Sequence, residues 1–571
     1  MRKFIYSILL LTTFSLQAAI PAGTVKKRML SDLDFIKSVF EVKYAPRAWK
    51  QEHKGWNLDA EIENAKNRVL NDPQPTVKNF HIILKELFNS ACDYHVGIDF
   101  YSTEEAYLPF MIKGAEGRYY VVYVNHTKRV SNDISVGDEI FTFNERPIAE
   151  VIAELKECEC GYNTPETDQA LAEMLLTARR GDFGTKVPQG SVELTLKKKS
   201  SGAIKRVQVQ WAYTPEKIPD LGKIGTSYQC CALMKQPAEE TFDHPLSQNP
   251  LLKKMMICPT WERSLTKRVS NPYALGARRS FIPALGKKLW QSNDRCSFDA
   301  YIFAHRSGKK IGYIRIPHYL GDEEEVEEFG EVISYFQQAT DALVVDQIDN
   351  PGGDVFYLYA LASMLTDRPL YTPKHHFMLT QQEVNMAIQL LPVLEQIPDS
   401  ATARDLFGDT LSGYHVDFEM IRLFRGFCRF VIDEWNSGNL YTKPIYLMGI
   451  DDVRPHPRHR FTKPILLLTN ALDFSGGDFF PAILQDSQRA TILGTRTSGA
   501  GGYVQPTQFF NQTGIKGFHL TGSLAERKNK QPLENLGVVP DIHYELTSID
   551  LQENYIEYVE AILSGVDGIL K

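Results

Sequence analysis

The stretch ALDFSGGDFFPAIL, residues 471–484, places a serine and two glycines between an apolar run and a segment with the pattern of a helix. The preceding run PILLLT, residues 464–469, is typical of a buried strand, so the glycines fall where the chain must turn sharply from strand to helix. Such a turn can present the Ser475 hydroxyl as a nucleophile. Alternatively, Ser475 and Asp478 form a capping box for the free helix amides, and the stretch by itself favours this cap.

A second unit of the same design lies earlier in the chain. ALVVDQIDNPGGDVFYLYALASML, residues 342–365, predicts a buried strand, a glycine turn and a helix. Two such units side by side would bring amide-rich turns together at one edge of a sheet. An oxyanion hole could form there from the N–H of Gly476 and a second N–H, that of Gly352 or Gly353.

Length, charge and the N-terminus restrict the class of protein. The 571 residues exceed a single core, and the net charge of −7 argues against a nucleic-acid partner, which would select a basic excess. Two basic residues, a short apolar run and small residues near Ala18 predict a secretory signal peptide over residues 1–18. No later stretch is long and apolar enough to span a bilayer, so we expect a secreted chain without stable membrane association.

The cysteines do not indicate a metal site. Eight cysteines are too few for a disulfide framework in a chain of this length. The close pairs Cys158/Cys160 and Cys230/Cys231 lack a second pair, or histidines, at the spacing of zinc ligands. We therefore expect no metal and no cofactor.

Four regions follow the signal peptide. Residues 19–105 repeat apolar positions at helical spacing and end in CDYHVGIDF, where His95 stands between a helix end and a strand-like run. Residues 106–218 alternate as strands do. Residues 219–300 carry scattered prolines, basic stretches and weak periodicity, which indicates a functional or irregular insertion. Strands and helices return in residues 301–571.

The strand-rich region contains VSNDISVGDEIFTFNERPIAEVIAEL, and its Val136-Gly137-Asp138 step resembles the PDZ family. A plain hairpin followed by a helix is the alternative. Three motifs then follow in order: DQIDNPGG, DFSGGDFFP and ILGTRTSGAGGYVQ. This order resembles the C-terminal processing peptidases, which are serine proteases with a crotonase- and ClpP-like α/β core. Most members activate the serine with a lysine in a later turn, but this chain has Ala500 there, so another base must accept the proton.

A narrower resemblance indicates which residue is the base. VKYAPRAWK, DYHVGIDF, VFYLYALASMLTDRPL and LTGSLAERKNKQPLENLGVVPDI are similar to the family of the chlamydial protease-like activity factor. That family uses a serine, a histidine and a glutamate. The resemblance implies Ser475 as the nucleophile, His95 as the general base and Glu534 in LENLGV as the acid that orients the imidazole.

Asp93 and Asp541 are alternative acids, since the sequence does not show which positions meet. With a histidine in place of the missing lysine, the nucleophile becomes the favoured role of Ser475, and a capping role can coexist with it. The resemblance further implies a zymogen and a homodimer, exported from an intracellular bacterium and delivered to the host cytosol, where it acts on host proteins.

Together these observations predict a secreted α/β serine endopeptidase with protein substrates. Its expected parts are a signal peptide (1–18), a helical region (19–105), a PDZ-like domain (106–218), an internal pro-segment (219–300) and a peptidase core (301–571). An irregular segment between the histidine-bearing and serine-bearing halves suits an occluding role. The alternative from another class is a non-catalytic PDZ-type protein-binding module on a peptidase-like fold.

Overall fold

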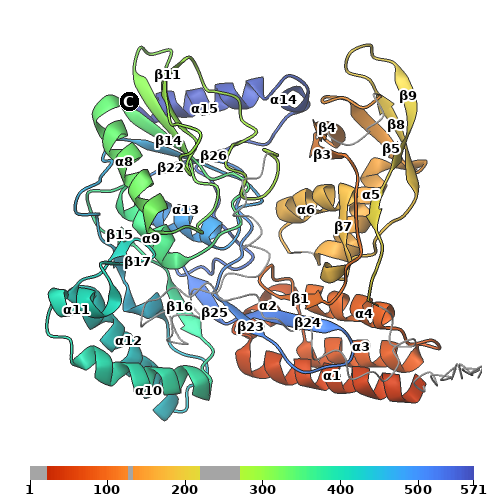
Figure 1. Ribbon diagram of the computed structural model, residues 1–571, viewed down its shortest axis with the longest axis horizontal. Coiled ribbons are helices and arrows are strands. Elements are labelled where there is room, and N and C mark those ends of the chain that lie inside the picture. The colour runs from red at the N-terminus through yellow and green to blue at the C-terminus, as the bar shows by residue number, and fades with distance from the viewer. Residues whose placement is uncertain (1–21, 126–132, 162, 219–270) are drawn as a thin grey trace, which may run out of the picture.

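The computed structural model describes residues 22–125, 133–161, 163–218 and 271–571 (Figure 1). The expected signal peptide and residues 219–270 of the expected pro-segment lie outside the described residues. No helix in the described parts of the chain combines the length and the apolar composition needed to cross a membrane.

The largest layer is a seven-stranded sheet in the order β11-β12-β13-β14-β21-β22-β26. Its strands are β11 (Lys288–Gln291), β12 (Ala300–Ala304), β13 (Lys310–Arg315), β14 (Ala342–Asp346), β21 (Ile465–Thr469), β22 (Thr491–Gly494) and β26 (Ile542–His543). The strands from β13 to β26 run parallel, so their carboxyl ends share one edge. The turns after β14 and β21, both predicted from the sequence, therefore meet at that edge.

Helices cover both faces of this sheet. Successive strand residues point to opposite sides, and apolar side chains on both sides must be buried. In β14, Leu343 and Val345 face one hydrophobic cluster, whereas Ala342 and Val344 face the other. The first face is covered by α8 (Glu323–Ala339), α9 (Val355–Ser363) and α13 (Gly476–Asp486); the second is covered by α14 (Ser548–Gln552) and α15 (Ile556–Ile569). Burial on both faces explains why the strands read as continuous apolar runs.

A helical extension lies beside this core, at the lower left of Figure 1. It comprises α10 (Gln381–Glu395), α11 (Ser400–Phe407) and α12 (Phe418–Asn436). A three-stranded sheet in the order β19-β16-β25 joins the extension to the core; its strands are β16 (Lys374–Phe377), β19 (Ile445–Tyr446) and β25 (Ser523–Glu526).

The PDZ-like region forms a separate lobe. Its main sheet contains β3 (Phe110–Ala115), β4 (Arg118–Val124), β5 (Glu139–Phe143), β8 (Ser191–Lys197) and β9 (Ile204–Gln210), with the short β6 (Arg146–Pro147) paired to β5. Two helices, α5 (Ile148–Leu155) and α6 (Pro165–Thr177), pack against this sheet. Asp138 of the predicted turn is fully buried and accepts the Ser135 N–H at 2.8 Å, which fixes the approach to β5.

The N-terminal region is helical, as predicted, and is tied to the C-terminal part of the chain. It contains α1 (Ala22–Lys43), α2 (Arg47–Lys54), α3 (Leu58–Asn71) and α4 (Val77–Asn89). The next strand, β1 (Gly97–Phe100), pairs antiparallel with β24 (Ile515–Thr521), and β24 pairs with β23 (Val504–Thr507). The pairing aligns Gly97 with His519 and so carries the nearby His95 to the serine-bearing half.

Residues 271–300 differ from the expectation that an irregular pro-segment runs to residue 300. Phe281 and Leu285 are buried in the cluster under α15, and Ala277 O accepts the Arg315 Nε–H at 2.9 Å. β11 adds an edge strand to the central sheet. This segment is part of the peptidase core because its few apolar side chains find long-range partners that local periodicity does not reveal.

Candidate active site

Ser475 stands at the amino end of α13 in a backbone conformation that residues with side chains rarely adopt. Its φ is 53° and its ψ is −110°, and its side chain makes no capping hydrogen bond. The capping-box interpretation is therefore wrong. Such conformations cost about 1–3 kcal/mol and persist where the surrounding structure imposes them. The partly exposed hydroxyl is left unused by the helix.

Asp478, the other member of the expected capping box, instead anchors the loop 497–500. Its carboxylate is fully buried and accepts the N–H groups of Gly499 at 2.7 Å and Ala500 at 3.0 Å. The hydroxyls of Thr497 and Ser498 donate to it at 2.5 and 2.9 Å. Burial raises the pKa of Asp478 to about 6. Asp478 thereby holds beneath α13 the loop in which Ala500 replaces the lysine of the resembling family.

The turn after β14 packs directly on the serine turn. The Phe474 N–H donates to Asn350 O at 2.8 Å, and Asp473 Oδ1 accepts the Asn350 N–H at 3.0 Å. A Cβ placed on Gly352 would lie 2.8 Å from the Ser475 Cβ and 2.9 Å from the Gly476 N. Only a glycine fits at residue 352, and the two predicted units do face one another.

The three expected oxyanion-hole donors are not equivalent. The Gly352 N–H donates to Asn350 Oδ1 at 2.8 Å, so the expectation that it could bind an oxyanion is wrong. In the described residues, the N–H groups of Gly353 and Gly476 have no acceptor. They lie close together, since a Cβ built on Gly476 would be 3.3 Å from the Gly353 N. Gly476 also begins α13, whose dipole favours negative charge there.

His95 is buried in the turn before β1. Its backbone N–H donates to Asp93 Oδ1 at 2.8 Å, and the Nδ1 of its imidazole ring has no hydrogen-bond partner in the described residues. The ring of Tyr94 packs edge-on against that of Phe474, with 5.4 Å between the ring centroids. The residues immediately before His95 and Ser475 are therefore in contact. Within the described residues, no hydrogen bond joins His95 to Ser475 or to Glu534.

Glu534 is fully buried between two segments of the site. Its Oε2 accepts the Gly501 N–H at 3.0 Å, which ties it to the loop held by Asp478. Its Oε1 accepts a hydrogen bond from Lys50 Nζ at 2.5 Å. Glu534 is thus fixed beside the serine half by Gly501 and beside the helical region by Lys50.

Lys50 of α2 is the residue that joins the histidine and glutamate segments. It is fully buried, and its Nζ also donates to Cys92 O at 2.5 Å and Asn535 Oδ1 at 2.7 Å. Asp93 Oδ2 lies 4.0 Å from the same nitrogen. One ammonium group therefore holds the backbone three residues before His95 and the side chains of Glu534 and Asn535.

The two alternative acids lie in different places. Asp93 is buried and accepts the hydroxyls of Tyr44 at 3.0 Å and Thr521 at 2.8 Å. Asp541 is exposed and accepts the Ile492 N–H at 2.8 Å, where β22 begins. Only Asp93 shares the buried network of Lys50 and Glu534, and its carboxylate is already occupied by these hydroxyls and the His95 N–H.

Burial dominates the electrostatics of this network. It lowers the pKa of His95 below the ordinary 6.5; Lys50 adds to the effect and Asp93 opposes it. Burial and then the charge of Asp93 raise the pKa of Glu534, whereas Lys50 opposes that rise. The neutral imidazole, which can accept a proton, is therefore the favoured form of His95 at neutral pH.

The PDZ-like lobe braces the site through the first turn of α6. The hydroxyls of Thr164 and Thr167 donate to Ser498 O at 2.8 Å and to Ala471 O at 2.6 Å. Asp168 accepts the Tyr94 hydroxyl at 2.7 Å. This lobe therefore contacts the serine loops and the histidine turn.

Known families match the PDZ-like lobe and the core that contains the seven-stranded sheet. A PDZ domain model matches residues 104–218, and a model of peptidase family S41 matches residues 310–544. An uncharacterized protein of Chlamydia muridarum is 38% identical over 97% of this chain and 95% of its own length. A protein of Chlamydia pneumoniae is 38% identical over 94% of this chain and 89% of its own length. The chain belongs to peptidase family S41.

Solved structures agree with this assignment. The structure of mature CPAF complexed with lactacystin is 34% identical to this S41 peptidase, covers 96% of it and 99% of the solved chain, and has a TM-score of 0.83. A second structure, of mature CPAF alone, has the same identity and TM-score. The chain is a CPAF-like serine peptidase with a PDZ domain and an α/β peptidase core, as the sequence predicted.

Sequence reasoning missed Lys50 in this S41 peptidase. Lys50 lies in the motif VKYAPRAWK, but a lysine in a short, polar amphipathic helix usually faces solvent. Its burial depends on carboxylate and carbonyl partners that lie 42 to 485 residues away. No local pattern marks such a residue, so only the assembled fold identifies it.

Proposed function

We propose that this serine peptidase cleaves polypeptide substrates internally through Ser475, His95 and Glu534. The observation that carries the proposal is the arrangement at the start of α13. Ser475 adopts a strained conformation and its hydroxyl makes no capping hydrogen bond, while the nearby N–H groups of Gly353 and Gly476 have no acceptor among the described residues. Two N–H donors next to a nucleophilic hydroxyl can bind the oxyanion that forms during acyl transfer.

In this mechanism the Ser475 Oγ attacks the carbonyl carbon of the peptide bond while His95 accepts its proton. The Gly353 and Gly476 N–H groups bind the oxyanion of the tetrahedral intermediate. His95 then donates the proton to the leaving amine, which yields an acyl-enzyme. Water, deprotonated by His95, attacks the ester and releases the acid product.

Glu534 stabilises the imidazolium that forms twice in this cycle. The His95 Nδ1, which has no hydrogen-bond partner in the part of the chain that the structure describes, is the atom that would donate to an acid, either directly or through a water. Catalytic hydrogen bonds often tighten only when substrate binds. Lys50 and the Gly501 N–H lower the pKa of Glu534, but burial and Asp93 together raise it to about 8, so the ionised fraction of Glu534 grows as the pH rises through that value.

The alternative function is peptide-tail binding by the PDZ domain without catalysis. Such binding adds a strand to a free sheet edge next to a helix. Here α6 packs along the edge strand β3, and the buried Glu173 carboxylate lies against Gly114, where an added Cβ would approach Glu173 Oε1 to 2.5 Å. Strand addition at this position would have to displace that contact, which weighs against the alternative.

A fluorophosphonate probe separates the two functions, because only an activated serine reacts with it. We expect wild type to be labelled at Ser475, as located by peptide mapping, and Ser475→Ala to remain unlabelled. Wild-type protein that is folded by circular dichroism yet unlabelled would support the binding module.

The pH dependence provides a further prediction. His95 must be neutral to act as a base, and burial lowers its pKa below 6.5. Protonation of His95 should therefore lower kcat/KM only below pH 6.5, whereas protonation of Glu534, whose pKa burial raises to about 8, should lower it as the pH falls through that value. Measurement of kcat/KM between pH 4 and 9, in wild type and Glu534→Gln, checks this. A decline above pH 7 that persists in Glu534→Gln would instead indicate a lysine-like base.

Export, host substrates and a homodimeric state also belong to the proposal. The signal-peptide pattern of residues 1–18 supports secretion. The family resemblance implies a homodimer that acts on host proteins in the host cytosol, and the relatives from Chlamydia agree with that resemblance. Protein substrates follow from the peptidase family, whereas the host origin of the substrates rests on the resemblance alone.

We further propose that the chain is a self-processing zymogen. Its support is the irregular composition of residues 219–270 and the description of one relative as mature CPAF. Purified wild type should convert to associated fragments of about 25 and about 30 kDa, cut in this segment, whereas Ser475→Ala should stay intact. Gel electrophoresis with N-terminal sequencing measures both. Identical cuts in Ser475→Ala without added protease would contradict self-processing.

A further inference from the structure

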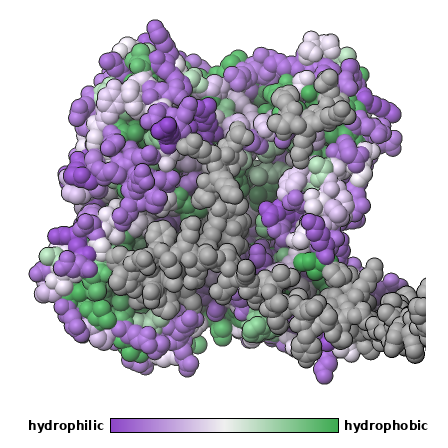
Figure 2. Space-filling view, in the orientation of Figure 1, coloured by the Kyte–Doolittle hydropathy of each residue, from purple (hydrophilic) through white to green (hydrophobic). Residues whose placement is uncertain are grey.

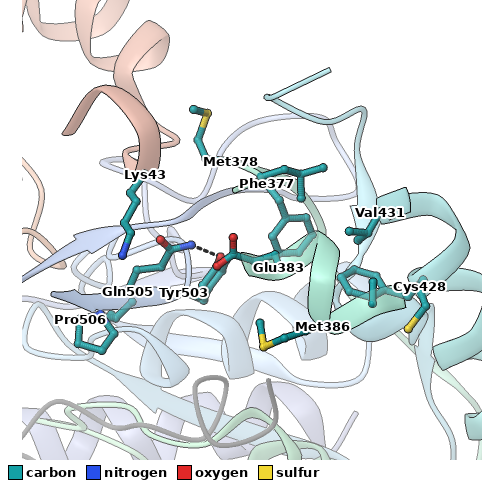
Figure 3. Close-up of a pocket in the computed structure, with 14 residues that line it drawn as sticks. Lys43, Phe377, Met378, Glu383, Met386, Cys428, Val431, Tyr503, Gln505 and Pro506 are labelled. Carbon is teal, nitrogen blue, oxygen red and sulfur yellow. Dashed lines mark hydrogen bonds between the residues drawn. The ribbon is translucent and has the colours of Figure 1, made fainter. Parts of the chain in front are cut away.

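A cavity separate from the candidate active site lies between α10, α12 and β23 (Figure 3). Its volume is ≈ 60 Å³, several times what one water needs. Met386 of α10 and Val431 of α12 lie at its apolar end in Figure 3, and Ala387 of α10 also lines the cavity. In Figure 3 the polar ends of Glu383, Tyr503 and Gln505 gather at the other end. The cavity therefore has one apolar and one hydrogen-bonding end.

The hydrogen-bonding end contains an unsatisfied buried amide. Gln505 is 6% exposed; its Nε2 donates to the Tyr503 hydroxyl, but its Oε1 has no partner in the described residues. Flipping the amide would leave the nitrogen unpaired in place of the oxygen. Buried polar groups are normally hydrogen-bonded, so this end of the cavity lacks one partner. A peptide backbone, which carries both N–H and C=O groups, can supply it in either orientation.

One wall of the cavity is an edge strand. β23 pairs only with β24 in the described structure, and the Gly522 N–H donates to Tyr503 O at 2.8 Å. The alternation of an antiparallel ladder then turns the N–H and C=O of Val504 away from β24. An extended peptide can pair with such an edge while a side chain enters the neighbouring cavity.

The edge strand is continuous with the candidate active site. Gly501, whose N–H binds Glu534, precedes Val504 by three residues, which is about 10 Å of extended chain. A substrate bound along β23 would therefore place its cavity residue about three to five positions from the bond that reacts.

From these observations we infer that the cavity is a substrate subsite. It takes an apolar side chain, such as leucine or methionine, from an extended polypeptide whose backbone pairs with Val504 and the Gln505 amide. This inference rests on the proposed peptidase function and adds a determinant of cleavage specificity. Two methionines at the cavity, Met378 and Met386, can adapt to side chains of different shape.

The test begins with one cleavage site mapped in β-casein. Synthetic peptides extend eight residues to either side of this cleavage site. In each pair of peptides, one position between the third and the fifth residue on one side carries leucine in one peptide and aspartate in the other. Wild type should cleave the leucine peptide about tenfold faster than the aspartate peptide, in kcat/KM, at one of these positions. Rates are expressed per serine labelled by the fluorophosphonate probe.

Two variants fill the cavity from different helices, so that the test can still be made with one variant if the other does not fold. Ala387→Trp and Val431→Trp, both at residues only 3% exposed, should reduce the leucine preference to less than twofold. The matched control is Ile388→Trp, at a neighbouring α10 residue that is 52% exposed, and it should retain the preference. Loss of preference in the control, or its retention in both filled variants, would overturn the subsite. Absence of cleavage or labelling in wild type would instead overturn the proposed function.

Discussion

Replacement of Ser475 or His95 by alanine should lower proteolysis by ~10⁴-fold or more, and the double variant should be no worse than either single variant. In the proposed mechanism both side chains belong to one acyl-transfer unit, so the loss of either one should already abolish the function of the other. The measurement is kcat/KM on a peptide substrate, with thermal unfolding to establish that each variant is folded. Near-wild-type turnover in His95→Ala would contradict the histidine assignment.

Ser475→Gly is a matched variant for this experiment. Like Ser475→Ala it removes the hydroxyl, but glycine adopts a φ of 53° and a ψ of −110° without the strain that a Cβ imposes. We expect both variants to be inactive and Ser475→Gly to be about 1 kcal/mol more stable to unfolding than Ser475→Ala. Equal or lower stability of the glycine variant would show that the turn is not strained by the Cβ.

Lys50→Met should have the second largest effect. It leaves the Glu534 carboxylate buried without its cation and near Asp93, and removal of one partner from a buried ion pair costs about 3–5 kcal/mol. Loss of Lys50 would raise the pKa of Glu534 further, so less of the protein would carry the carboxylate that the proposed mechanism uses to stabilise the imidazolium, and kcat per labelled serine should fall by ~10²-fold or more. Denaturant unfolding and active-site titration measure the two effects separately.

Two controls distinguish a catalytic effect from general instability. Lys198 of the PDZ domain is also buried and paired, with Asp138, so Lys198→Met should lower stability but leave kcat per labelled serine unchanged. Lys50→Met/Glu534→Gln removes the buried charge and should regain part of the stability without activity. Wild-type kcat in Lys50→Met would contradict the proposed role of Glu534.

Much of the fold follows from local patterns. The strand before Ser475, the glycine turn at 350–353 and the amphipathic N-terminal helices were all predicted, and the structure has them. Periodicity and glycine positions encode these elements because the backbone geometry of a strand, turn or helix depends on neighbouring residues. The family motifs added the PDZ domain and the serine peptidase class.

Several expectations failed where a group finds a hydrogen-bond or packing partner that the sequence pattern does not reveal. Asp478 has the spacing of a capping residue, yet its carboxylate binds the loop 497–500, which supplies two N–H and two hydroxyl donors at once. Gly352 has the position of an oxyanion donor, yet Asn350 takes its N–H. The apolar residues of 271–300 lack periodicity, yet they complete the core beneath α15.

The sequence by itself determined the strand-turn-helix units, the serine at one of these turns and the absence of a lysine at residue 500. Tertiary structure alone decided which backbone amides remain free to bind an oxyanion. It also decided which carboxylate lies near the segment of His95, and that Lys50 connects this segment to Glu534. The physical reason is that hydrogen-bond satisfaction and burial depend on groups hundreds of residues apart. Residues 50, 95, 475 and 534 acquire a shared environment only when β1 pairs with β24 and the turns of the central sheet pack together.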